Sequence, residues 1–175
     1  MIEHLEKITV FLENIGIPVV YTELPEDTFL PGIQIQHGSL AVDTERLCYV
    51  GDLLHEAGHI ACMAPSTRLE TFADAGEDMG EEIASHAWSY AAALACGLPP
   101  EEVFHENGYK GSASWLCAHY KEGGTNGVPL LQWFNMTHMP DLKNPDIMNP
   151  NDFPCMQQWL RPMDDPTKFW QEQPD

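Results

Sequence analysis

The segment at residues 53–64, LLHEAGHIACMA, places two histidines four residues apart within an otherwise apolar helical pattern. Asp52 before it is a candidate N-cap, and Pro65 would end the helix. Residues four apart lie on one face of a helix, so His55 and His59 share a face while Leu, Ile and Ala side chains can pack on the other side. This pattern predicts a buried helix with one polar face.

The rest of the chain indicates an α+β fold. A second helix is predicted at 81–96, EEIASHAWSYAAALAC, because its apolar residues recur at helical spacing before Gly97 and Pro99. An amphipathic helix is predicted at 2–15. Segments rich in β-branched and aromatic residues predict a small antiparallel sheet at 17–22, 32–36, 39–43 and 46–50. Shorter helices are predicted at 100–104, 112–121, 129–136 and 156–160.

Length and composition predict one domain spanning residues 1–175. A chain of 175 residues with 43% hydrophobic side chains can form a single core but is short for two. Residues 141–175 are dense in Pro, Asn and Asp, so we expect them to form an irregular C-terminal wrap over the domain.

The charge and the cysteines restrict partners and compartment. A formal net charge of -19 would repel phosphate backbones and anionic lipid, so nucleic acid and membrane surfaces are not expected partners. The sequence contains neither a membrane-spanning apolar stretch nor a signal-peptide pattern. Its five cysteines are widely spaced and odd in number, which indicates reduced thiols and a cytoplasmic protein.

Residues 55–59, HEAGH, form an H-E-x-x-H motif. On a helix, the imidazoles of His55 and His59 can reach one Zn²⁺, and Glu56 is placed beside the open position of the metal. The motif predicts a zinc site in which Glu56 acts as general base and does not coordinate the metal.

A catalytic zinc site needs a third protein ligand, and Glu77, Glu81 and Glu82 are the candidates near the second helix. A helical wheel places Glu81 at the border of the apolar face and Glu82 nearly opposite that face. The wheel therefore favours Glu81 as the third ligand and predicts that Glu82 points toward solvent.

The motif followed by Glu-x-x-Ala in a later helix resembles the gluzincin class of zinc metallopeptidases, particularly small ImmA/IrrE-type proteins. The resemblance covers about 52–97 and implies a zincin-like fold with His55, His59 and Glu81 as zinc ligands and Glu56 as general base. Many gluzincins carry an Asp four residues after the ligand Glu, where this chain has Ser85. The alternative register pairs Glu82 with His86.

These residues predict a zinc-dependent hydrolase, specifically an intracellular metallopeptidase that binds one Zn²⁺ and cleaves peptide or protein substrates. The alternative is a zinc-stabilised binding or regulatory module without turnover. A hydrolase benefits from a donor that stabilises the oxyanion, and His119, His138, Tyr109 and Arg161 are the candidates.

Overall fold

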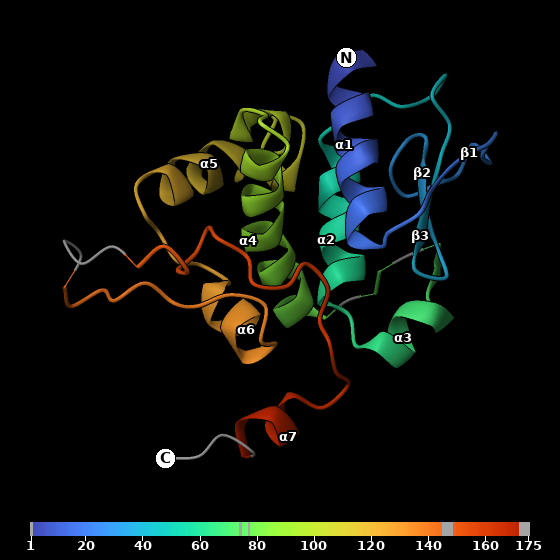
Figure 1. Cartoon of the computed structure of the whole chain (residues 1–175). Coiled ribbons are helices and arrows are strands. Elements are labelled where there is room, and N and C mark those ends of the chain that lie inside the picture. The colour runs from blue at the N-terminus through green and yellow to red at the C-terminus, as the bar shows by residue number, and fades with distance from the viewer. Residues whose placement is uncertain (1, 74, 77, 145–148, 172–175) are drawn as a thin grey trace.

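Helix α2 (Asp52–Cys62) lies at the centre of the fold, between a small sheet and helix α4 (Met79–Ala95) (Figure 1). The computed structural model describes residues 2–73, 75–76, 78–144 and 149–171. Every residue of α2 except His55 is buried, and helix α1 (Ile2–Ile15) also packs on α2. The three longest predicted helices are confirmed, with small differences at their ends.

The sheet has the strand order β1-β3-β2-β4, formed by β1 (Val19–Tyr21), β2 (Ile33–Gln36), β3 (Ser39–Val42) and β4 (Phe72–Ala73). Strand β3 pairs antiparallel with β2 but parallel with β1, and β4 pairs antiparallel with β2. The predicted antiparallel sheet is therefore wrong in one pairing, because the sheet is mixed.

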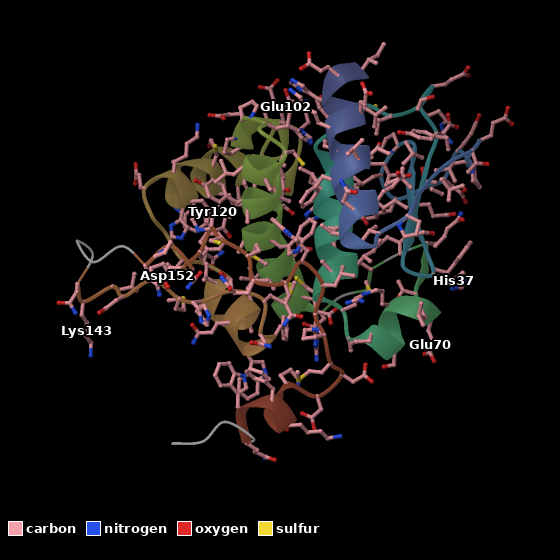
Figure 2. All side chains as sticks on the ribbon, in the orientation of Figure 1. His37, Glu70, Glu102, Tyr120, Lys143 and Asp152 are labelled. Carbon is pink, nitrogen blue, oxygen red and sulfur yellow. The ribbon has the colours of Figure 1, made fainter. Side chains whose placement is uncertain are left out.

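Loop length explains the difference. A two-residue turn at His37 and Gly38, both with positive φ, joins β2 to β3 and requires an antiparallel hairpin. The turn lies beside helix α3 (Pro65–Glu70), where Nδ1 of His37 is 3.0 Å from the Leu69 carbonyl oxygen (Figure 2). The longer connection from β1 to β2 imposes no such direction, and β1 pairs with β3 instead.

The predicted strand at 46–50 is absent, because Asp43 turns the chain away from the sheet. Its side chain accepts a hydrogen bond from the Glu45 amide, and its carbonyl accepts from the amides of Arg46 and Leu47. The edge position beside β2 is taken by β4, a segment for which no strand was predicted.

The remaining helical elements lie in the second half of the chain. The 3-10 turn Pro100–Glu102, helix α5 (Ala113–Lys121) and helix α6 (Val128–Trp133) fall within predicted helices or begin one residue earlier. Helices α3 and α7 (Pro166–Gln171) and the 3-10 turn Tyr109–Gly111 were not predicted, and 156–160 is not helical. Among the described helices, none is long and apolar enough to cross a membrane.

An irregular segment that contains Trp159 and Arg161 crosses helices α1, α2 and α4. The Trp88 indole of α4 donates to the Trp159 carbonyl at 2.9 Å, and the Arg161 amide donates to the Ala61 carbonyl of α2, also at 2.9 Å. The Phe11 ring of α1 meets Trp159 edge-on, with centroids 4.8 Å apart. This segment thus contacts α1, α2 and α4.

Candidate metal centre

The two motif histidines meet on one face of α2. Their Nε2 atoms are 3.3 Å apart, and their ring centroids are separated by 4.7 Å. The buried apolar residues of α2 pack toward the sheet and the neighbouring helices, which fixes the direction of the polar face. The same-face placement predicted from their spacing is confirmed.

Helix α4 adds a carboxylate to this pair. Oε2 of Glu82 lies 3.0 Å from Nε2 of His59. One ligand atom each from His55, His59 and Glu82 lies within 4.8 Å of the others, and this is the one such group of three found among the described residues.

The structure does not bring Glu81 into this group. Its Oε1 lies 3.9 Å from a guanidinium nitrogen of Arg161, on the segment that crosses the helices. The preference for Glu81 over Glu82 therefore disagrees with the geometry, and the alternative register, Glu82 with His86, agrees with it. The third candidate, Glu77, lies outside the described residues.

The prediction that Glu82 points toward solvent is wrong, because its carboxylate contacts His59 and His86. The wheel ranked the burial of the two glutamates correctly but did not find the face that meets α2. The Glu81 side chain is 19% exposed and the Glu82 side chain 36%. The face of α4 toward α2 includes two small polar residues, Ser85 and Ser89, both fully buried. A wheel that counts only apolar residues as buried misses this contact.

Gly58 lets α2 and α4 approach closely enough for Glu82 to reach the histidines. A Cβ at Gly58 would lie 3.0 Å from both the Ser85 carbonyl oxygen and Oγ of Ser89. The Ser89 hydroxyl lies 3.1 Å from the Leu54 carbonyl oxygen and 2.7 Å from the Ser85 carbonyl oxygen. This buried hydroxyl between the two helices therefore has hydrogen-bond partners.

The surroundings favour a neutral His55 and an ionised Glu82, whereas they shift His59 toward its protonated form. Burial lowers the pKa of His55 to about 3, and the neighbouring His59 adds to the effect. Burial also lowers the pKa of His59, but its hydrogen bond to Glu82 and the charge of Glu56 outweigh that effect and raise it. Hydrogen bonds from His59 and His86 hold the pKa of the Glu82 carboxyl well below its usual range.

These donors fit a zinc ion in type and in spacing. Zinc prefers His nitrogen and carboxylate oxygen, and tetrahedral bonds of ~2.0–2.1 Å place ligand atoms about 3.3 Å apart. The His55–His59 and His59–Glu82 separations are 3.3 and 3.0 Å. Nδ1 of His55 is buried without a hydrogen-bond partner, so no such bond fixes the tautomer that would leave Nε2 free for a metal.

Tyr109 covers the site from another part of the chain. Its ring packs edge-on against His55 and His86, with centroids 5.1 Å away in both cases, and its hydroxyl is buried without a partner. Burial raises the pKa of Tyr109 well above its usual value, and the charges of Asp52, Glu82 and Glu56 add to the shift.

The other candidates for oxyanion stabilisation have different partners. Nε2 of His119 accepts from the Asn126 amide, and His138 is exposed. The Arg161 guanidinium donates to the carbonyls of Met163 and Asp164 and lies over the Phe134 ring.

Sequence reasoning missed a second polar pair beside the motif. Asp52 does not cap α2: Gly51 holds the N-cap position, and Oδ1 of Asp52 lies 2.8 Å from Nε2 of His105. His105 also stacks on Tyr49, with ring centroids 3.8 Å apart. No spacing rule connects residues 52 and 105, so the pair becomes visible only in the fold.

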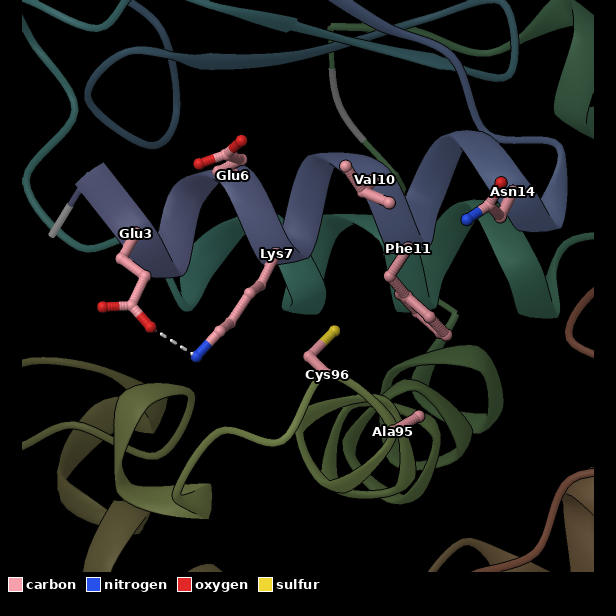
Figure 3. Close-up of a pocket in the computed structure, with 8 residues that line it drawn as sticks. All are labelled: Glu3, Glu6, Lys7, Val10, Phe11, Asn14, Ala95 and Cys96. Atoms are coloured by element: carbon pink, nitrogen blue, oxygen red, sulfur yellow. Dashed lines mark ion pairs between the residues drawn. The ribbon is translucent and has the colours of Figure 1, made fainter.

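Two surface hollows lie away from the three candidate ligands. A groove of 490 Å³ runs between α1 and the end of α4, where Lys7 pairs with Glu3 beside Val10, Phe11 and Cys96 (Figure 3). A second hollow of 260 Å³ is lined in part by Tyr49 and His105. Neither includes His55, His59 or Glu82.

In the comparisons with known proteins, no family model, no curated protein and no solved structure matches the chain.

Proposed function

We propose that the chain is a zinc-dependent hydrolase that binds one Zn²⁺ through His55, His59 and Glu82. The observation that carries the proposal is the convergence of their ligand atoms within 4.8 Å of one another. The ligand set has the composition of catalytic zinc sites, with two histidines, one glutamate and a fourth position for water. We further propose an intracellular peptidase of zincin-like, gluzincin type that acts on peptide or protein substrates.

A bound zinc would supply Lewis acidity and lower the pKa of a coordinated water. Glu56, which is buried next to His55, would take the proton of the attacking water and deliver it to the leaving group. Tyr109 has a buried hydroxyl without a partner beside His55, and this hydroxyl would donate to the substrate carbonyl oxygen.

A second candidate function is a zinc-stabilised binding or regulatory module without turnover. The observation in its favour is that His59 and Glu56 are buried, with exposed fractions of 6% and 8%, as residues of a closed structural site are. The presence of Glu56 favours the hydrolase, because a purely structural metal site does not use a carboxylate at that place.

Metal analysis and a peptide-library cleavage assay, both on untagged protein, test the proposal. We expect close to one zinc per chain, and Glu56→Gln should retain zinc but lose about 10²–10⁴ in rate. Glu102→Gln, at a surface residue paired with His4, is the matched control and should keep full activity.

Three outcomes of these assays would count against the hydrolase. Unchanged turnover in Glu56→Gln would refute its role as base. Full zinc occupancy without cleavage of any library peptide would favour the binding module. Absence of zinc after reconstitution would overturn both functions.

A further inference from the structure

Both oxygens of the Glu82 carboxylate contact imidazole nitrogens. Oε2 lies 3.0 Å from Nε2 of His59, and Oε1 lies 3.0 Å from Nε2 of His86. His86 follows Glu82 by four residues on α4, so the helix itself holds this second contact in place. A carboxylate only accepts hydrogen bonds, and therefore Nε2 of His86 carries the proton.

Ring packing restricts where His86 can turn. Its side chain is 13% exposed. The imidazole is tilted against the His55 ring at 5.8 Å between centroids and meets the edge of Tyr109 at 5.1 Å. These neighbours hold the ring with Nε2 toward Glu82.

His86 has two conceivable relations to a metal held by this site. As a fourth protein ligand it would close the coordination sphere, as in structural zinc sites. As a donor to Glu82 it would leave one position open. The geometry favours the donor, because Nε2 of His86 faces Oε1, the carboxylate oxygen that does not contact His59. His86 also lies outside the group of converging ligand atoms.

We propose that His86 is a positioning residue: it occupies Oε1 of Glu82, so that Oε2 alone coordinates the metal and the fourth position stays open. The proposal rests on the metal site of the proposed function. His86 stands four residues after Glu82, in the alternative register that pairs these two residues. The proposal also separates a hydrolytic site, with three protein ligands, from a closed structural one.

The test uses zinc-loaded full-length protein and needs no substrate. X-ray absorption at the zinc edge counts imidazole ligands, and chelator competition measures zinc affinity in His86→Gln, His86→Leu and the control His138→Leu, at an exposed histidine. We expect two imidazole ligands in the wild type. His86→Leu should bind zinc about 10–100-fold more weakly, as for other outer-shell partners. His86→Gln keeps a donor and should recover most of that loss, and His138→Leu should match the wild type.

Two results would overturn the proposal. The first is three imidazole ligands in the wild type, with two remaining in His86→Leu, which would make His86 a ligand. The second is wild-type affinity in His86→Leu. If that variant does not fold, the wild-type ligand count and His86→Gln decide the question. Wild-type protein that binds no zinc refutes the metal site itself, whereas two imidazole ligands without cleavage refute only the hydrolase.

Discussion

Nε2 of His59 lies 3.0 Å from Oε2 of Glu82, so a direct polar contact joins the motif helix to α4 at the candidate metal site. The contact places a proton where a metal would bind. In metal-free protein the pair contributes to folding, and in loaded protein zinc would replace that proton.

In metal-free protein, the Glu82→Gln substitution should cost most stability in a defined pH window. The pKa of Glu82 is lowered from 4.5, so its contribution is present above pH 4.5 and is lost as pH falls toward the folded pKa. The pKa of His59 is raised from 6.5, so its contribution is present below pH 6.5 and is lost as pH rises through the folded pKa. The difference in unfolding free energy between wild type and variant should therefore peak between these values.

Urea unfolding below, within and above the window measures this difference. We expect on the order of 1 kcal/mol or less, because Glu82 is partly exposed to solvent. A difference that does not change with pH would mean that the ion pair does not form.

The Gly58→Ala substitution should push α2 away from α4. Alanine is intrinsically better than glycine in a helix by about 1 kcal/mol, yet the added methyl would lie 3.0 Å from the Ser85 carbonyl oxygen. We expect a net loss of ~1–3 kcal/mol in unfolding free energy, together with weaker zinc binding. Thermal unfolding of Gly58→Ala beside Gly80→Ala, whose methyl would approach only the Asp78 carboxylate, checks this. A stabilised Gly58→Ala protein would contradict the close helix packing.

Two tyrosines offer a matched comparison for the buried hydroxyl near the site. The Tyr109 hydroxyl has no partner, whereas the Tyr120 hydroxyl donates to the Asn126 carbonyl at 2.8 Å. Denaturant unfolding of the metal-free protein should show Tyr109→Phe equal to or more stable than wild type, and Tyr120→Phe less stable by ~0.5–1.5 kcal/mol. Equal losses in both variants would show that Tyr109 has a partner in solution.

Local patterns in the sequence predicted the elements that form the site. The spacing of His55 and His59, the helical periods around them and the stop at Pro65 all depend on residues close in the chain, and α2 follows them. The same reasoning failed for β1, whose partner is set by loop length and sheet assembly.

The third ligand shows a different limit. Burial along α4 was ranked correctly for Glu81 and Glu82, but the direction of a neighbouring helix does not follow from hydrophobicity when the contact is made by Gly58, Ser85 and Ser89. The spacing of Glu82, Ser85 and Ser89 at steps of three and four is the signal that marks this face. Tyr109 and His105 contact residues from distant segments of the chain, so no local sequence pattern predicts these contacts.

Zinc affinity of Glu81→Gln and Glu82→Gln, measured side by side by chelator competition, tests the metal site most directly. The residues are adjacent, carry the same charge and lie in the same helical turn, so they differ mainly in direction. We predict that Glu82→Gln weakens zinc binding by more than the about 10–100-fold typical of an outer-shell partner, while Glu81→Gln stays within a few-fold of wild type. Loss of zinc in Glu81→Gln with full retention in Glu82→Gln would contradict the account.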